Sequence, residues 1–257
     1  VHVFDNRAWQ NARRMFQRDE WVHGEPEDTA RARLAEVLEQ ARATGAAESR
    51  FLVHDHSVAR GLQQLCDEEA PDLLVLGARG EHWLKDMVLG TTALKVLRAS
   101  RVPVLVSRLP AAQNYRTAVL AVDFSPASER AAQLALQAFP AVKPQLVHAF
   151  EVPMEGRMRL AGAKADELEL YLRIARSHAE AELQGFAARV LGQHVRNAAV
   201  QAIHGSPASV LEEAAAGAKA ELMAIGRHGG SALDERLMGS VTDNVLHYAP
   251  CDVLLVP

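Results

Sequence analysis

Short apolar runs alternate with amphipathic stretches along this chain, and the alternation is clearest in its second half. The apolar runs are expected to be strands over 117–122, 145–150, 198–203, 221–226 and 251–256. Helical periodicity follows Ser125-Pro126 and fills 164–191 and 208–216. Strands that alternate with helices favour right-handed crossovers and a parallel sheet covered by helices. The pattern therefore predicts the α/β class.

The first half of the chain repeats the second. Gly77-Ala-Arg-Gly80 is followed by nine residues and Gly90-Thr91, and Gly226-Arg-His-Gly229 is followed by nine residues and Gly239-Ser240. Each of these glycine loops follows an apolar run and precedes a helical stretch and a last apolar run. Such a match over whole segments indicates an internal repeat of domain size.

The repeat predicts a first domain over 1–108 and a second domain over 115–257, joined by an exposed connector. Val1-His-Val-Phe-Asp5 parallels Val147-His-Ala-Phe-Glu151, so the first copy begins at its second strand. We expect about 30 residues, which would form an opening strand and helix, to be absent ahead of the first copy. Another chain that donates the strand is the rival explanation.

The glycine loops have the chemistry of an anion site. Each loop leads from a buried strand into a helix that begins with a hydroxyl residue, Thr91 or Ser240. Free N–H groups at a helix start attract negative charge, and glycine lets the backbone approach an oxygen closely. Gly239 is expected to tolerate no side chain. The alternative interpretation is that each loop is a tight structural turn that no longer binds a ligand.

The same spacing argues against rapid phosphoryl transfer. It is neither a P-loop nor the Gly-x-Gly-x-x-Gly of a dinucleotide fold, and no lysine follows the last glycine. Without that lysine or an evident metal-binding acid, transfer lacks electrostatic support. Binding is therefore favoured over catalysis, and no catalytic residue is assigned. A slow ATPase or autokinase that uses Ser240, Thr242 or Thr91 as acceptor is the enzyme alternative.

Asp123 is a further site candidate because of its position. The strand 117–122 delivers it to the carboxyl edge of the sheet, where ligands of open α/β sheets bind. A carboxylate beside Ser125-Pro126 is also a common turn or helix-capping group, and this reading stays open. His228, inside the second loop, is either a phosphate contact or an ordinary loop histidine.

Together these motifs resemble the universal stress protein family. The resemblance rests on both glycine loops, on Ala-Val-Asp123-Phe-Ser125 and on Val147-His148-Ala149, and it covers nearly the whole chain. It implies two tandem doubly wound, parallel five-stranded sheets of strand order 3-2-1-4-5, the first without its opening strand. It also implies an adenine nucleotide, ATP or AMP with Mg as an optional companion, bound by a sensor or scaffold of the stress response. The implied contacts are Asp123, Ala149, Gly226, Arg227, Gly229, Gly239 and Ser240 in the second repeat, and Val3, Gly77, Gly80, Gly90 and Thr91 in the first.

The family's last strands pair across a dimer, so the resemblance implies that the two repeats pair within this chain. A homodimer of such chains is a further option. A nucleotide-independent interaction module, in which the folds only present surfaces, is the third functional reading. Either repeat could be the weaker nucleotide site, because Asp234-Glu235 adds negative charge to the second loop, whereas the first has Lys85-Asp86.

Composition narrows the remaining classes. The formal net charge is −4 without a dense basic stripe, which argues against nucleic acid as a partner. Two distant cysteines suggest neither disulfides nor zinc, and no apolar run reaches the length of a membrane helix, so a cytoplasmic protein is expected. His54 and His56 share one face of a strand, but without further ligands we assign no metal site.

Overall fold

The computed structural model describes residues 2–5, 11, 26–42, 51–54, 57–78, 89–108, 114–153, 155–229 and 238–257. The chain divides into two compact units, Val1–Ala70 and Pro71–Pro257, and each is described by itself.

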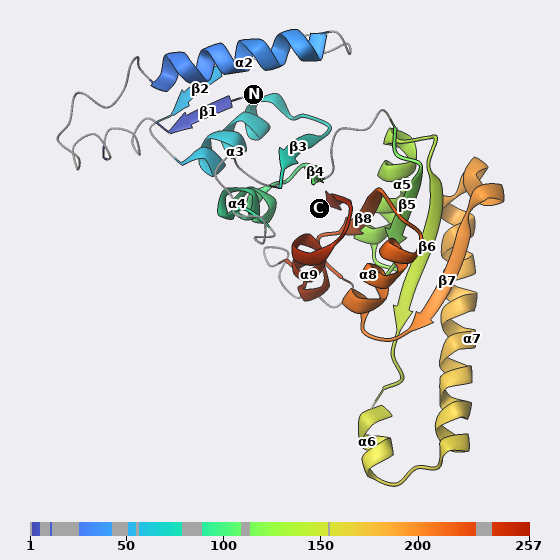
Figure 1. Cartoon of the computed structure of the whole chain (residues 1–257). Coiled ribbons are helices and arrows are strands. Elements are labelled where there is room, and N and C mark those ends of the chain that lie inside the picture. The colour runs from blue at the N-terminus through green and yellow to red at the C-terminus, as the bar shows by residue number, and fades with distance from the viewer. Residues whose placement is uncertain are drawn as a thin grey trace. The chain divides into compact units, whose positions relative to one another are not determined.

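In the part of the first unit that the structure describes, two strands run parallel beside the helices α2 and α3 (Figure 1). Strand β1 (His2–Asp5) pairs with β2 (Phe51–His54) in register from His2↔Phe51 to Asp5↔His54. Helices α2 (Pro26–Arg42) and α3 (Val58–Glu69) both contact β1. The side chain of Val3, at the centre of β1, is buried.

The second unit is built on a seven-stranded sheet of order β3-β4-β9-β8-β5-β6-β7. Its elements in chain order are β3 (Leu74–Gly77), α4 (Thr91–Ala99), β4 (Val104–Ser107), β5 (Thr117–Ala121), α5 (Pro126–Ala138), β6 (Lys143–Phe150), α6 (Glu155–Leu160), α7 (Ala165–Val190), the 3-10 helix η1 (Gly192–Asn197), β7 (Ala199–His204), α8 (Pro207–Gly217), β8 (Leu222–Gly226), α9 (Ser240–Tyr248) and β9 (Asp252–Val256).

The five strands of the second repeat are all parallel. Counted within the repeat, their order β7-β6-β5-β8-β9 is 3-2-1-4-5, which confirms the predicted doubly wound α/β fold. Helices α5 and α7 pack on one face, around Leu120, Leu146 and Phe186, while α8 and α9 pack on the other, around Val119 and Val147. Because neighbouring strand residues point to opposite faces, each strand supplies both cores.

The last strands of the two repeats pair with each other, as expected. Strand β4 runs antiparallel to β9, in register from Val104↔Leu255 to Val106↔Val253. The side chains of these four residues are almost fully buried. Each apolar edge is thus covered by the other, which removes two strand edges from solvent.

The strands of the first repeat form two separate pairs, β1–β2 in one unit and β3–β4 in the other. In the second repeat β5 joins the corresponding pairs, since it bonds to both β6 and β8. No described strand of the first repeat holds that place, as expected for a sheet without its opening strand. Strands β3 and β4 join the sheet of the second repeat, because β4 bonds to β9. The boundary between the two units accordingly lies between residues 70 and 71. The predicted domains, 1–108 and 115–257, follow the repeat instead.

Helix α5 begins as the sequence predicts. Ser125 is the N-cap, its Oγ accepts a hydrogen bond from the Ser128 N–H at 3.1 Å, and a proline follows at the first helical position. The short helix α6 was not expected from the sequence. It lies beside the end of α7 that extends past β6 and β7 (Figure 1).

Candidate functional site

The candidate site lies where strands β8, β5 and β6 end side by side. From β5 the chain moves to β6 on one side and only later returns to β8 on the other. This is a topological switch point, and its crevice at the carboxyl ends of the strands is where open α/β sheets bind ligands. Asp123 lies two residues after β5, Ala149 is the next-to-last residue of β6, and Gly226 ends β8.

Asp123 is exposed, and its two carboxylate oxygens have different surroundings. Oδ1 accepts hydrogen bonds from the backbone N–H of Ser125 at 3.0 Å and from its hydroxyl at 2.6 Å. Oδ2 faces the glycine loop, because a Cβ placed on Gly229 would lie 3.0 Å from it. Phe124, between these residues, has a φ of 63°, which is costly for a residue with a side chain. The carboxylate thus holds the turn with one oxygen and presents the other to the loop.

Gly226 and Gly239, at the two ends of the second loop, have different steric surroundings. A Cβ on Gly226 would lie 2.8 Å from the Cβ of Ala127 and 3.0 Å from the backbone of Ser128, so this glycine allows α5 to pack on β8. On Gly239 the nearest atom to a Cβ would be the Arg227 carbonyl oxygen at 3.5 Å, an ordinary contact, and its φ is −61°. The prediction that Gly239 tolerates no side chain is therefore wrong for a methyl group in the protein by itself, whereas larger side chains and the effect on a bound nucleotide stay predictions.

The start of helix α9 closes the loop. The N–H of Gly239, its N-cap, donates to the Arg227 carbonyl at 3.1 Å, and no side chain caps the helix. Ser240 is exposed at the first helical position. The buried Thr242 donates its hydroxyl to the Gly226 carbonyl at 2.9 Å, so it stabilises the loop. Because this hydroxyl is buried and hydrogen-bonded, it is poorly placed to accept a phosphoryl group. The uncapped helix start beside Gly229 suits an anion.

The side chain of Arg227 lies away from this helix start. It is buried, and its Nη2 donates to the carbonyl of Leu97 at 3.1 Å and to that of Ser100, at the end of α4. Burial lowers the pKa of Arg227. Arg108 makes the reciprocal contact, donating its Nη2 to the Leu246 carbonyl in α9. The two arginines therefore connect the repeats, and the Arg227 guanidinium is engaged there instead of facing a phosphate.

The first loop has the same backbone framework. The N–H of Gly90 donates to the Ala78 carbonyl at 3.0 Å, and the N–H of Ala78 donates to Ser107 at 2.8 Å, as Arg227 does to Val256 at 2.8 Å. Thr91 is exposed at the first position of α4, and Gly77 ends β3. Gly80 lies outside the described residues. Val3 belongs to the first unit, whereas Gly77, Gly90 and Thr91 belong to the second.

Ala149 is half-buried and packs on the core beneath α8 and α9. In His228 the buried Nδ1 has no hydrogen-bond partner among the described residues. The acidic and basic residues expected to tune the loops, Asp234-Glu235 and Lys85-Asp86, lie outside the described residues. Within the described ranges no three His, Cys, Asp or Glu residues are grouped to hold a metal ion.

The sequence did not reveal the roles of Arg227 and Thr242. The carbonyl partners of Arg227 lie 127 and 130 positions earlier in the chain, so no local pattern distinguishes this arginine from a surface one. For Thr242 a signal did exist, since it occupies a core-facing position two residues after Ser240. It was instead considered as an acceptor.

The sequence model of the universal stress protein family matches residues 1–108 and 114–257. This chain therefore belongs to the universal stress protein family. No curated protein matches it.

Solved structures share the fold at low identity. A universal stress protein of Pseudomonas aeruginosa UCBPP-PA14 is 15% identical over 93% of this chain and 80% of its own, with a TM-score of 0.61. A protein of Pseudomonas aeruginosa PAO1, described as functionally unknown, is 14% identical over 99% and 90%, with a TM-score of 0.62. A universal stress protein of Archaeoglobus fulgidus DSM 4304 is 18% identical over 93% and 84%, with a TM-score of 0.57.

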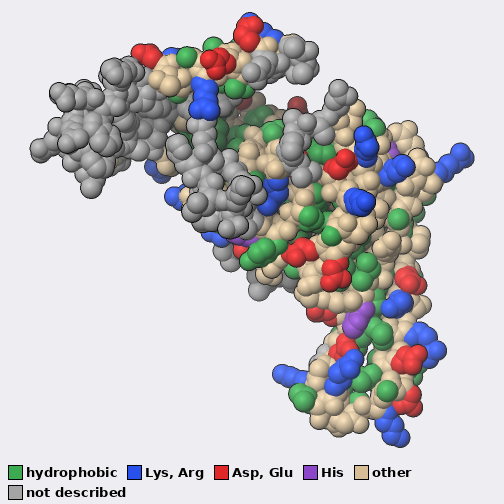
Figure 2. Space-filling model, in the orientation of Figure 1, with side chains coloured by type: hydrophobic (Ala, Val, Ile, Leu, Met, Phe, Trp, Pro, Cys, Tyr) green, Lys and Arg blue, Asp and Glu red, His purple; other side chains and the backbone are tan. Residues whose placement is uncertain are grey.

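Figure 2 shows Lys and Arg side chains scattered among acidic ones over the face that it draws. None of the described helices is both long enough and apolar enough to cross a membrane.

Proposed function

We propose that this chain binds an adenine nucleotide, ATP or AMP, at the second glycine loop and acts as a sensor or scaffold of the stress response. The observation that carries the proposal is the meeting of Asp123 Oδ2, Gly229 and the uncapped start of α9 at the switch point of the sheet. A helix start suits phosphate oxygens, and a carboxylate at the sheet edge suits ribose hydroxyls. Magnesium could accompany a bound ATP.

Backbone groups would hold most of the nucleotide in this proposal. The amides around Gly229 and Ser240 would face the phosphates, Gly239 would let a phosphate approach the backbone, the Ser240 hydroxyl would add a donor, and Ala149 would lie beside the base. Arg227 contributes through its place in the loop, because its guanidinium is bound to α4. In the first repeat Gly77, Gly90 and Thr91 would form the corresponding loop.

The proposal concerns binding, with turnover as the alternative. Ser240 and Thr91 are the exposed hydroxyls at the two helix starts, whereas the hydroxyl of Thr242 is buried and donated to a carbonyl. A slow autokinase would therefore label Ser240 or Thr91. A third reading, an interaction module that ignores nucleotides, predicts no ligand effect on stability. The proposal includes a cytoplasmic location, paired repeats within the chain and an optional homodimer.

The test is calorimetric titration of the purified protein with ATP and AMP, with and without magnesium. We expect a dissociation constant of about 1–100 µM for the preferred nucleotide. Ser240→Ala and Asp123→Ala should each weaken binding, while the matched control Ser206→Ala should not. Ser206 precedes α8 after strand β7, which lies two strands from β5, and its side chain makes no capping hydrogen bond.

Thr91→Ala reports on the first loop, so the two hydroxyl variants show which repeat binds. The proposal is overturned if wild-type protein binds neither nucleotide, or if both hydroxyl variants and Asp123→Ala bind as wild type does. Release of phosphate or labelling of Ser240 over hours would favour the enzyme alternative.

A further inference from the structure

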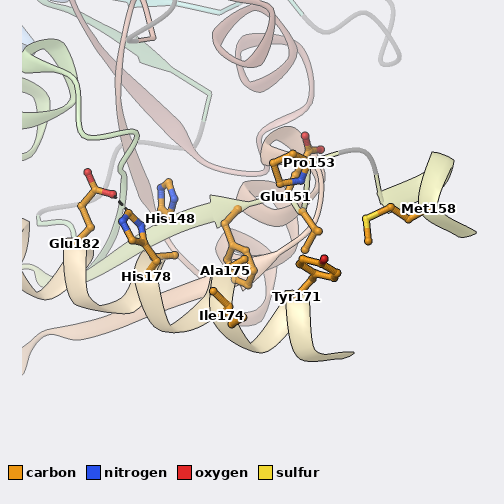
Figure 3. Close-up of a pocket in the computed structure, with 12 residues that line it drawn as sticks. His148, Glu151, Pro153, Met158, Tyr171, Ile174, Ala175, His178 and Glu182 are labelled. Atoms are coloured by element: carbon orange, nitrogen blue, oxygen red, sulfur yellow. Dashed lines mark ion pairs between the residues drawn. The ribbon is translucent and has the colours of Figure 1, made fainter. Parts of the chain in front are cut away.

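A cavity of about 610 Å³ opens between the end of strand β6, helix α6 and the stretch of α7 from Tyr171 to Glu182 (Figure 3). Its α7 side is one helix face, since Tyr171, Ile174, Ala175 and His178 follow at intervals of three and four residues. Figure 3 shows these side chains along α7, with Met158 of α6 across from Tyr171. Helical spacing and a strand end therefore build a concave site of the size that small molecules occupy.

The cavity lies on the other side of the sheet from the nucleotide-binding elements. His148 and Phe150 line it, whereas Ala149 between them packs on the core beneath α8 and α9. Neighbouring strand residues point to opposite faces, so one strand end serves both places. None of the glycine-loop residues that the structure describes lines the cavity. It is therefore separate from the proposed nucleotide site.

Helix α6, which supplies one wall, contacts the sheet through Glu155, whereas the Arg159–Glu155 ion pair lies within the helix. The Glu155 carboxylate lies 2.9 Å from Nε2 of His204 at the end of β7 and 2.7 Å from Nη2 of Arg159. The Arg159 hydrogen bond and His204 together lower the pKa of Glu155. Glu155 is therefore ionised near neutral pH and anchors α6 to the sheet edge beside the cavity.

The walls are mostly apolar, and part of that apolar surface meets solvent. Phe150, Val152 and Met158 line the inside. Tyr171 and Ile174 at the mouth are 50% and 57% exposed, which is unusual for large side chains that lie together. A ligand with an apolar body would cover them.

The polar groups of the cavity are acceptors and acids. Nδ1 of His148 lies 2.8 Å from the Val122 carbonyl, and because a carbonyl oxygen only accepts, Nδ1 carries the proton and Nε2 is the acceptor of the neutral ring. Glu151 and Glu182 add two carboxylates. Nδ1 of His178 lies 3.8 Å from the Glu182 carboxylate, and both side chains are exposed, so this contact is weak. Among the described residues that line the cavity there is no lysine or arginine.

We propose that this cavity binds a small hydrophobic amine, with an aromatic or alkyl body against Met158, Tyr171 and Ile174 and its ammonium group toward Glu151, the carboxylate at that end of the cavity (Figure 3). The acidic lining favours a cation and disfavours phosphates and carboxylates. The Tyr171 ring adds a face that attracts cations. The enclosure by three elements favours a small molecule over a flat protein surface.

The test uses two probes of the same shape and opposite charge, tryptamine and indole-3-propionate, followed by ligand-observed NMR and calorimetry. A ligand of this size should bind with a dissociation constant of about 1 mM or tighter. Tryptamine should bind at least about tenfold more tightly than the acid. Glu151→Gln should remove that preference, while the control Glu169→Gln, an exposed residue of α7 outside the cavity, should keep it.

Ala175→Phe, which fills the cavity, should abolish binding of both probes. Circular dichroism checks its fold, and the two charge variants test the proposal even if this variant unfolds. The proposal is overturned if wild-type protein does not bind tryptamine, if both probes bind equally, or if the amine binds the filled and wild-type proteins alike. Loss of a dimer in Ile174→Glu without amine binding would assign the face to a second copy of the chain. ATP titration of the same variants tests the nucleotide site independently.

Discussion

Gly226→Ala should destabilise the protein through packing alone. The new methyl group would lie 2.8 Å from the Ala127 Cβ and 3.0 Å from the Ala127 carbonyl carbon and the Ser128 nitrogen. Carbon atoms in contact prefer about 3.5–4.0 Å, so α5 must move away from β8 by several tenths of an ångström. The helix cannot move freely, because Ala131 and Leu136 pack in the core beneath it.

Overpacking of this kind costs about 1–3 kcal/mol. For a chain of this size each kcal/mol lowers the melting temperature by about 2–4 °C, so Gly226→Ala should melt about 2–12 °C below wild type. The matched control is Gly239→Ala. Its methyl group would meet nothing closer than 3.5 Å, and its negative φ suits any residue, so stability should change by less than about 0.5 kcal/mol.

Thermal and urea unfolding of the two variants, followed by circular dichroism, check this prediction. If the proposed nucleotide site is correct, Gly239→Ala should also lose about tenfold in ATP affinity, since the methyl group would stand where a phosphate approaches the backbone. Equal melting of Gly226→Ala and wild type, or equal losses in both variants, would refute the packing argument.

Three further outcomes are expected. Arg227→Met should lower the free energy of unfolding by about 2–3 kcal/mol in urea titrations, because two carbonyls at the end of α4 lose a charged donor; wild-type stability would contradict this. Ser125→Ala should lower it by about 1 kcal/mol, since α5 loses its cap, and an unchanged urea midpoint would speak against that role. Burial raises the pKa of the Cys251 thiol from its ordinary value near 9 to about 12, so the native state keeps a proton that the unfolded state releases. Stability should therefore fall as pH rises from 9 toward 12, and less so in Cys251→Ala; pH-dependent urea titrations in which both proteins respond alike would rule out this thiol as a cause.

Local patterns in the sequence were sufficient for the fold of the second repeat. Alternating apolar runs and helical periodicity predicted the parallel sheet, and Ser125-Pro126 predicted the start of α5, because each signal lies within a few residues of the element that it describes. The glycine spacing placed both loops at helix starts. The place of Asp123 at the carboxyl edge of the sheet followed from the position of a strand end, while its role in a ligand site stays a prediction.

Only the tertiary structure decided which groups meet across long separations. An apolar last strand predicts that its edge is covered, and resemblance suggested the partner, but the register of Val104 with Leu255 depends on the whole sheet. Arg227 looks like a surface residue in the sequence and is buried against α4, because its acceptors lie more than a hundred positions away. The cavity beside α7 likewise depends on how α6, β6 and α7 are packed. Local sequence determines periodicity and turns, whereas burial and partners depend on the packing of the complete chain.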